Sequence, residues 1–575
     1  MSTIPPSQLP PSPVPSVDVA DPPPWRSARL RFVHHREDRV VPGPGRVALP
    51  AVLAGVGLAL SLPPWGFWIL AFPSAGLLWW RLGGLRPRTR LWAGWLSGLG
   101  CFIPGLAWAR AFTWPGAIVL IAVEALFPAV ACLVVPARPV LARALAFPAA
   151  LTLAEALRQT WPFGGLPIGG VFLGQADGPV LALARLGGPL ALTGGVFLGG
   201  VAVAAIIEAV LASSRDRRRA RTFARTGLAE SATISDTIAG HGRLALAGVA
   251  AAIVLIGATI IATNAPDGGS SLGTVTAAAV QGGGVRGFRK SQIDPAVVLA
   301  AQQAATRRMQ QLDGGRAPQL VLWPEDVVSL DTNLDGTAEA GSLSALARSL
   351  HTTLVVGITE SVSATTFRNE MVAWGPDGSL VDRFEKVHRV PFGEYVPLRG
   401  FFAHFADLSS VPLDAIPGTG SGLMSTPAAP LGALISFEVF YADRGRPSVR
   451  SGAQLLIVPT NTSSYASSQV PTQEIAAAEI QATEQGRDLL QAAPTGFSAV
   501  VTNRGRLVTR TSLGTQQIVF ADLSRRSGWT VYVRYGDWPP LVLAGVALLA
   551  GWFIAGRRPS ASGSDSDTDS DTDRS

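Results

Sequence analysis

Long apolar blocks separated by short polar segments dominate the first half of the chain. They lie near 47–62, 65–80, 91–109, 115–135, 144–157 and 187–212, and two more follow at 244–262 and 539–555. A helix needs about 20 mostly apolar residues to cross a bilayer. Gly and Pro inside such helices are tolerated where neighbouring helices satisfy the backbone. The pattern predicts a polytopic α-helical membrane bundle of about eight spans.

Arginine residues cluster in every second loop between these blocks. The clusters are Arg31, Arg36, Arg39 and Arg46; Arg81, Arg86, Arg88 and Arg90; Arg138 and Arg143; and Arg215, Arg217, Arg218, Arg219, Arg221 and Arg225. Basic loops stay in the cytoplasm, so the N-terminus is predicted inside. Six spans then occupy 46–212, a seventh at 244–263 leaves the cytoplasm, and an eighth at 538–556 returns. Residues 270–525 are therefore expected on the extracytoplasmic side.

The remaining segments are polar. Residues 1–45 are rich in Pro, Ser and Arg and predict a disordered cytoplasmic tail without a cleavable signal peptide. Residues 213–243 predict a basic cytoplasmic linker, and the Ser/Thr/Asp-rich residues 557–575 predict an acidic disordered tail. The net charge of +7 is explained by membrane topology, and no nucleic-acid motif accompanies it. Nucleic-acid binding is therefore disfavoured.

The large loop between the last two spans alternates predicted strands and helices. The strands are Thr274–Val280, Gln319–Trp323, Leu354–Ile358, Ala433–Phe437, Leu455–Val458 and Ile518–Ala521, and a hairpin joins Glu370–Trp374 to Leu380–Phe384. Amphipathic helices are predicted near 294–313, 342–350 and 471–489. This alternation favours an α/β domain with a layered sheet core.

Cysteine and histidine usage argues against a disulfide framework or a metal site. The two cysteines, Cys101 and Cys132, lie in separate apolar blocks and are predicted to be small buried hydrophobic side chains. The six histidines show no zinc-ligand spacing, and no nucleotide-binding loop stands out. We therefore expect neither a metal nor a cofactor.

Three segments of the α/β domain carry candidate chemistry. Trp323-Pro324-Glu325 follows a strand, where a carboxylate at a pocket mouth is suited to general-base work, although a solvated loop residue gives the same pattern. Leu434-Ile435-Ser436-Phe437-Glu438 would lift a hydroxyl toward solvent on a strand-to-helix turn. A Ser at a strand end is also a common capping residue.

Lysine usage singles out the third segment. The chain contains only Lys290 and Lys386, and Lys386 lies just after the hairpin in an aromatic- and Pro-rich loop. A lysine is a compact charge with a tunable pKa, unlike arginine, so Lys386 is a candidate functional residue. Lys290 is predicted to lie in an exposed turn, and His388 and Arg389 at the surface.

Together these segments resemble one family. Trp323-Pro324-Glu325, then Lys386-Val387-His388-Arg389-Val390-Pro391-Phe392-Gly393-Glu394-Tyr395-Val396-Pro397, then Ile435-Ser436-Phe437-Glu438, all between membrane spans, resemble apolipoprotein N-acyltransferases, a membrane-bound branch of the nitrilase superfamily. The resemblance covers about residues 45–556.

The resemblance implies an α-β-β-α nitrilase-like domain and a Glu-Lys-Cys catalytic triad in a bacterial plasma-membrane protein. Glu325 would be the general base, Lys386 would stabilise the oxyanion, and Glu394 and Glu438 would be accessory carboxylates. An acyl chain would pass from a phospholipid to the enzyme, and then to the α-amino group of a lipoprotein's diacylglyceryl-cysteine. A polyprenol-phosphate mannosyltransferase would be a possible membrane neighbour.

The nucleophile position departs from the family pattern. Ser436 stands where the family has Cys, and Phe437 where it has Tyr. A hydroxyl needs a base to remove its proton, whereas a thiol is partly ionised near neutral pH. Two readings stay open: an acyltransferase that uses Ser436, or a weak or inactive paralogue that binds lipoprotein or phospholipid or scaffolds a neighbouring enzyme. A soluble amidase is disfavoured, because such an enzyme needs no membrane platform.

The outward loop 158–188 contains Trp161, Phe163 and several glycines. It would serve either as an interfacial aromatic anchor, which we favour, or as part of an entry for lipid tails.

Overall fold

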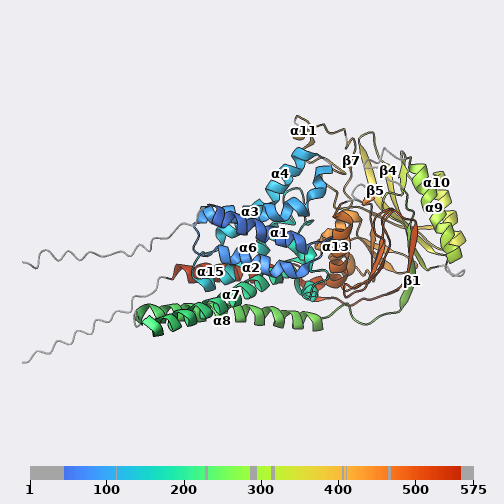
Figure 1. Ribbon diagram of the computed structural model, residues 1–575. Helices are drawn as coiled ribbons and strands as arrows, with labels where there is room; N and C mark the ends of the chain where they lie inside the picture. Colours follow the sequence, from blue (N-terminus) through green and yellow to red (C-terminus); the bar gives the residue numbers. More distant parts are fainter. Residues whose placement is uncertain are drawn as a thin grey trace, which may run out of the picture. The chain divides into compact units, whose positions relative to one another are not determined.

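The computed structural model describes residues 44–111, 113–226, 231–284, 294–312, 318–404, 407–409, 411–463 and 468–557. Both predicted tails, Lys290, and the side chains of the predicted linker at 215–241 lie outside the described residues or side chains. The helical part contains α1 (Pro44–Ser61), α2 (Ala71–Arg81), α3 (Pro87–Gly105), α4 (Trp114–Glu124), α5 (Leu126–Val134), α6 (Val140–Arg158), α7 (Ala184–Thr226), α8 (Ser231–Asn264) and α15 (Trp538–Gly556). These helices pack together as one bundle (Figure 1).

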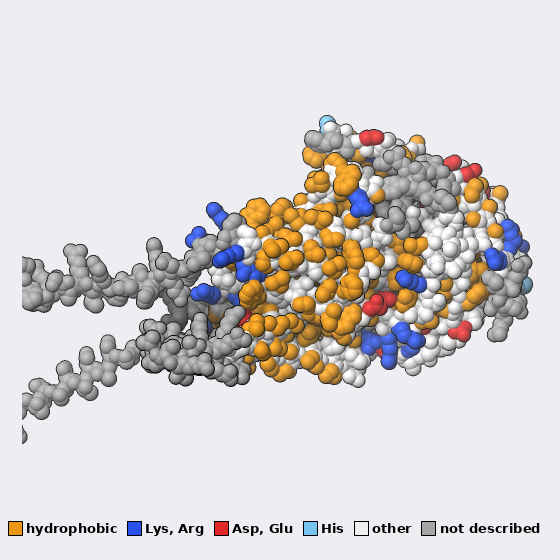
Figure 2. All heavy atoms as spheres, viewed as in Figure 1, with side chains coloured by type: hydrophobic (Ala, Val, Ile, Leu, Met, Phe, Trp, Pro, Cys, Tyr) orange, Lys and Arg blue, Asp and Glu red, His pale blue; other side chains and the backbone are white. Residues whose placement is uncertain are grey.

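Hydrophobic side chains cover the surface of this bundle (Figure 2). Ile118, Leu246 and Leu549 are 64%, 69% and 72% exposed, which is the surface expected of helices that face lipid. Within the described residues, five segments are long and apolar enough to cross a membrane: Trp114–Val134, Val140–Arg158, Leu181–Ser214, Gly242–Asn264 and Trp538–Gly556. The total of about eight spans stays a prediction.

The second apolar block does not form the single helix that was predicted for 65–80. A 3-10 turn occupies Trp68–Leu70, and α2 covers only Ala71–Arg81. Eleven residues reach roughly 16 Å as an α-helix, so α2 is too short to cross a bilayer alone. The predicted linker is also more helical than expected, because α7 continues to Thr226 and α8 begins at Ser231.

The domain between α8 and α15 contains two β-sheets. The first has the order β14-β1-β2-β4-β5-β6, with β3 paired to β4 and β7 paired to β5, and the second has the order β13-β12-β11-β10-β9-β8. The strands of the first sheet are β1 (Thr274–Gln281), β2 (Leu320–Leu322), β3 (Val328–Leu330), β4 (Thr353–Ser361), β5 (Thr366–Trp374), β6 (Leu380–Glu385), β7 (Asp414–Ala415) and β14 (Gln517–Ser524). Those of the second are β8 (Leu423–Ser425), β9 (Pro430–Ala433), β10 (Leu455–Pro459), β11 (Leu489–Ala492), β12 (Ala499–Val501) and β13 (Leu507–Arg510).

The two sheets pack face to face between two layers of helices. Ala277 and Val355 of the first sheet share a buried core with Ala433 and Ile457 of the second. On the outer face of the first sheet lie α9 (Pro295–Leu312) and α10 (Ala338–Leu350), and on that of the second lie α12 (Ala442–Arg450) and α13 (Val470–Gln485) (Figure 1). The predicted α-β-β-α architecture is confirmed.

The bundle and the α/β domain share a hydrophobic core. Phe102 and Phe172 from the bundle belong to the same buried cluster as Phe437, Phe440 and Ile480 of the α/β domain. We call this shared cluster the junction core. Helix α13 lies at the junction, between the bundle and the sheets (Figure 1). Two short helices complete the domain: α11 (Arg399–Phe402) and α14 (Val531–Tyr535).

One predicted strand was wrong at its end. The stretch Ala433–Phe437 was expected to be extended, but β9 ends at Ala433 and residues Ser436–Phe440 form a 3-10 turn. Leu434 continues the sheet with one hydrogen bond to Ile457 before the chain turns. The hydrophobic pattern did not distinguish this turn from a strand because both bury their apolar side chains.

Candidate active site

Two buried charged side chains, Glu325 and Lys386, meet the partly exposed Glu394 at the ends of strands of the first sheet. Lys386 Nζ lies 2.8 Å from Glu325 Oε1 and 2.8 Å from Glu394 Oε1. Lys386 is only 2% exposed and Glu325 5%. Glu325 follows β2, Lys386 directly follows β6, and Glu394 lies eight residues further on. The fold therefore brings together residues up to 69 positions apart in the sequence.

Burial and charge pairing set the ionisation of this cluster. Burial lowers the pKa of Lys386, but the carboxylates of Glu325 and Glu394 offset this and leave its pKa above the ordinary value. The lysine therefore stays an ammonium. Burial raises the pKa of Glu325, and although Lys386 opposes this, the nearby Glu394 adds to it. The Glu325 carboxyl group therefore holds a proton more strongly than an exposed glutamate does.

A buried amide completes the cluster. Asn369 on β5 donates hydrogen bonds from Nδ2 to Glu325 Oε1 at 2.8 Å and to Glu394 Oε1 at 3.0 Å. All hydrogen bonds that the structure describes for the Glu325 carboxylate end on Oε1, which leaves Oε2 for a substrate proton. Two of the three ammonium hydrogens of Lys386 are engaged, so one remains to stabilise an oxyanion.

Ser436 begins the 3-10 turn Ser436–Phe440 in a strained backbone conformation. Its φ is 53°, in the left-handed region that residues other than Gly, Asn and Asp rarely adopt. It is partly exposed, whereas Ile435 and Phe437 on either side are buried. This backbone conformation directs the Ser436 hydroxyl out of an otherwise buried turn, as the sharp turns that carry nucleophiles do.

Glu438 ties this turn to the loop that carries the lysine. Its carboxylate is fully buried and accepts hydrogen bonds from the backbone N–H of Val387 and His388 at 2.9 Å each through Oε1. Oε2 accepts from the N–H of Ile435, also at 2.9 Å. The residues that adjoin Lys386 and the residue that precedes Ser436 are therefore held by one side chain.

Comparison with known proteins agrees with this geometry. Residues 54–202 match the apolipoprotein N-acyltransferase N-terminal domain, and residues 276–528 match the carbon-nitrogen hydrolase family. The chain is 30% identical over 529 residues to an apolipoprotein N-acyltransferase from Mycolicibacterium smegmatis, a match that covers 87% of this chain and 84% of the relative. The chain belongs to the apolipoprotein N-acyltransferase family.

Two further likenesses were found. An apolipoprotein N-acyltransferase from Azotobacter vinelandii is 30% identical over 539 residues, covering 89% of this chain and 95% of that protein. Among solved structures, Saccharomyces cerevisiae Nit3, a member of branch 10 of the nitrilase superfamily, is 21% identical, with a TM-score of 0.34, and the match covers 44% of this chain and 91% of Nit3.

The structure of this N-acyltransferase family member assembles the residues predicted from sequence. Glu325, Lys386 and Glu394 are in direct contact, and Glu438 links Lys386's loop to Ser436 through the backbone. Their catalytic roles stay predictions. Among the described residues, no group of three or more His, Cys, Asp or Glu side chains has metal-binding geometry.

The prediction that His388 and Arg389 are surface residues was wrong. Both are only partly exposed. The His388 ring stacks on Tyr441 with ring centroids 4.2 Å apart, and Arg389 lies over the Tyr395 ring. Burial lowers the pKa of His388. Their neighbours in space come from distant segments, which the local sequence does not reveal.

Sequence reasoning missed three polar residues of the site. Asn369 lies mid-strand, Thr460 follows β10, and Glu474 lies on α13. All three are buried. A polar residue inside an otherwise apolar strand or helix face is a usable signal, and Glu474 gives it, since Ile475 to Ala478 after it are all apolar and buried.

The loop 158–188 of the bundle reaches this site. Tyr441 donates a hydrogen bond from its hydroxyl to the Gly165 carbonyl at 2.8 Å, and the Phe163 ring contacts Phe392 edge-on at 6.3 Å. Phe163 and Trp161 are 42% and 59% exposed. Whether these aromatic residues anchor the interface or line a lipid entry stays a prediction.

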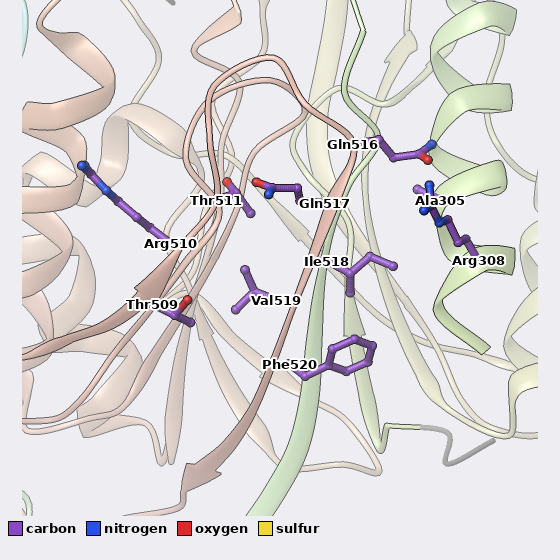
Figure 3. A pocket seen from close by; sticks show the side chains of 10 residues that line it. All are labelled: Ala305, Arg308, Thr509, Arg510, Thr511, Gln516, Gln517, Ile518, Val519 and Phe520. Carbon is purple, nitrogen blue, oxygen red and sulfur yellow. The ribbon is translucent and has the colours of Figure 1, made fainter. Parts of the chain in front are cut away.

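A separate pocket of about 500 Å³ lies at the edge of the two sheets, lined by α9, β13 and β14 (Figure 3). Its charged lining residues are Arg308 and Arg510, and it contains no carboxylate or lysine. It shares no residue with the Glu325–Lys386–Glu394 cluster. The candidate active site is therefore the cluster and not this pocket.

Proposed function

We propose that this chain transfers an acyl chain from a phospholipid to the N-terminal amine of a diacylglyceryl-cysteine lipoprotein, through an ester on Ser436. The observation that carries the proposal is the buried Glu325–Lys386–Glu394 cluster, joined by Glu438 to a strained, accessible Ser436. A position next to the apolar helices suits a substrate that cannot leave the bilayer.

In the first half-reaction, Ser436 Oγ attacks the carbonyl carbon of the phospholipid ester. The free ammonium hydrogen of Lys386 stabilises the negative charge that develops on the carbonyl oxygen. The lysophospholipid leaves with the proton that Ser436 gave up, and an oxygen ester remains on Ser436. In the second half-reaction, Glu325 Oε2 accepts the extra proton of the incoming α-ammonium group. The free amine then displaces Ser436, whose Oγ takes up the second amine proton as the amide forms.

The α/β domain is proposed to face the extracytoplasmic side. Arginine side chains gather at the end of the bundle that lies away from the sheets (Figure 2), and the sequence places basic residues in every second loop. The positive-inside rule puts that end in the cytoplasm. A polyprenol-phosphate mannosyltransferase as neighbour remains a prediction from the family resemblance.

A transfer assay tests the function. The full chain in lipid vesicles would receive a phospholipid with a labelled acyl chain and a synthetic diacylglyceryl lipopeptide. We expect labelled amide from the wild type, none from Ser436→Ala, and an acyl adduct on Ser436 by mass spectrometry when the lipopeptide is omitted. Transfer by the wild type no faster than by Ser436→Ala would refute the proposal. Gain of activity only in Ser436→Cys would show that the serine is not a working nucleophile.

A further inference from the structure

The hydroxyl of Ser436 has one described hydrogen-bond partner among the residues that the structure describes. Thr460 Oγ1 lies 3.3 Å from Ser436 Oγ. Thr460 follows β10, is fully buried, and its hydroxyl also lies 2.5 Å from Glu474 Oε1. Glu474 on α13 is 1% exposed. Ser436, Thr460 and Glu474 therefore form a continuous line of oxygen atoms from the accessible turn into the interior.

The direction of these hydrogen bonds follows from counting hydrogens. A threonine hydroxyl has one hydrogen to donate, so it cannot donate to Ser436 and to Glu474 at once. An ionised carboxylate only accepts. In the structure the Thr460 hydroxyl is placed to donate either to Ser436 Oγ or to Glu474 Oε1. When Glu474 is ionised and takes the Thr460 hydrogen, Thr460 Oγ1 is free to accept the hydrogen of Ser436. This order points the serine's proton away from the substrate and toward a carboxylate.

Glu325 is less suited to take this proton. Its described hydrogen bonds come from Lys386 and Asn369, and none joins it to Ser436. A serine hydroxyl, unlike a thiol, requires a base that removes its proton during attack. The described base with a hydrogen-bonded path to Ser436 is Glu474.

We propose that Thr460 and Glu474 form a proton relay that activates Ser436. This proposal rests on the proposed function for the identity of the substrate. As the Oγ–carbon bond forms, the Ser436 proton passes to Thr460 Oγ1 and the Thr460 proton passes to Glu474 Oε1. The carbonyl electron pair moves onto the oxygen near Lys386. When the carbon–oxygen bond to glycerol breaks, Glu474 returns a proton to Thr460, and Thr460 Oγ1 donates its own directly to the leaving glycerol oxygen. In the second half-reaction, the attacking amine gives one proton to Thr460 Oγ1 as Thr460 protonates Glu474, and the reverse transfer delivers a proton to Ser436 Oγ as its bond to the acyl carbon breaks.

The surroundings of Glu474 suit a base that works near neutral pH. Burial raises its pKa to about 8, the hydrogen bond from Thr460 opposes this, Glu325 adds to it, and Lys386 lowers it. Gln491 on β11 also faces the carboxylate, with Nε2 3.5 Å from Oε2. We therefore expect the reactivity of Ser436 to rise with pH with a midpoint near 8, because only ionised Glu474 can accept a proton.

Labelling by a fluorophosphonate tests the relay without lipid or lipoprotein. Such a probe forms a phosphorus–oxygen bond with an activated serine and releases fluoride. In the full chain we expect Ser436 to be labelled, and Thr460→Val and Glu474→Gln to slow labelling by roughly 10²-fold or more, the usual contribution of a general base. Glu474→Gln should also remove the rise toward pH 8. Absence of labelling in the wild type, or variants within threefold of it, would overturn the relay.

Matched controls separate chemistry from structure. Thr462→Val alters a second buried threonine on the same segment, whose hydroxyl has no described partner, and Glu479→Gln alters a second buried acid on α13. Both should label within threefold of the wild type.

A cysteine background provides the second test. In Ser436→Cys, alkylation by iodoacetamide should change less than threefold on adding Thr460→Val, since a thiol supplies its own thiolate. An equal loss in both backgrounds would show a structural role and overturn the relay. Loss of lipid transfer with labelling intact would instead contradict the proposed function alone.

Discussion

Replacing Glu438 by Gln removes the charge that holds the nucleophile turn against the lysine loop. The carboxylate is fully buried and accepts three backbone N–H groups, two from Val387 and His388 and one from Ile435. Arg444 Nε lies 3.5 Å from Oε1 as a weaker partner. A glutamine has the same shape but only one acceptor oxygen, so its NH₂ group must face at least one backbone N–H.

The cost follows from these contacts. Hydrogen bonds to a charged group contribute about 1.5–3 kcal/mol, neutral ones about 0.5–1.5, and an unsatisfied buried donor costs about 1–3. If the amide oxygen keeps Val387 and His388, two bonds weaken and the N–H of Ile435 loses its acceptor. We expect the free energy of unfolding to fall by about 3 kcal/mol. For a domain of about 250 residues, this corresponds to a melting temperature roughly 6–12 °C lower.

Thermal unfolding of the purified full chain measures this change in stability. The effect of Glu438→Gln on the turn is measured by fluorophosphonate labelling of Ser436, at a temperature where the variant is still folded. We expect slower labelling, because Ile435 directly precedes Ser436. Glu339→Gln in the first turn of α10, which is partly exposed, is the control and should cost less than about 0.5 kcal/mol. A loss below about 1 kcal/mol for Glu438→Gln would show that the three contacts do not hold the turn.

Three further predictions concern the same site. Lys386→Met leaves Glu325 and Glu394 without their ammonium partner, and the rate of acyl transfer should fall by roughly 10²–10³-fold. Lys386→Arg should not restore the rate, because a guanidinium does not fit the space of the ammonium. Single-turnover transfer measures this, and a rate in Lys386→Met near that of the wild type would contradict it. Asn369→Leu removes a hydrogen-bond donor that favours ionised Glu325, so the pKa of Glu325 should rise. The acidic limb of the profile of transfer rate against pH should then move to higher pH, and an unchanged limb would exclude Glu325 as the titrating group. Ser436→Gly should be more stable than Ser436→Ala by roughly 1 kcal/mol, because glycine adopts a positive φ without strain, while both lack transfer; equal melting temperatures would argue against strain at this turn.

The positions of several strands along the chain, and of the charged residues that follow them, could be predicted from sequence because they depend on local patterns. Strands β1, β4 and β10 are largely apolar runs, Glu325 lies three residues after β2, and Lys386 directly follows β6 of the predicted hairpin. The ends of parallel strands meet at one edge of a sheet, so residues there converge whatever their separation along the chain.

The parts that sequence did not predict depend on contacts between distant segments. Thr460 and Glu474 belong to the site because α13 packs over the end of β10, which brings Glu474 into contact with Thr460. The turn at Ser436–Phe440 has the apolar composition of a strand, and its geometry is fixed by Glu438 through the backbone of 387–388. Nothing in the local pattern of either segment encodes that partner.

The junction core has a consequence for where the reaction can take place. Phe437 and Phe440, on the same turn as Ser436, pack in one cluster with Phe102 of α3 and Phe172 of the loop between α6 and α7. The turn that carries Ser436 is therefore fixed relative to the helices of the bundle. If Ser436 is the proposed nucleophile, only ester groups at one depth in the bilayer would reach it. A thinner or thicker bilayer that tilts the helices would change that depth, so membrane thickness would itself select among acyl donors.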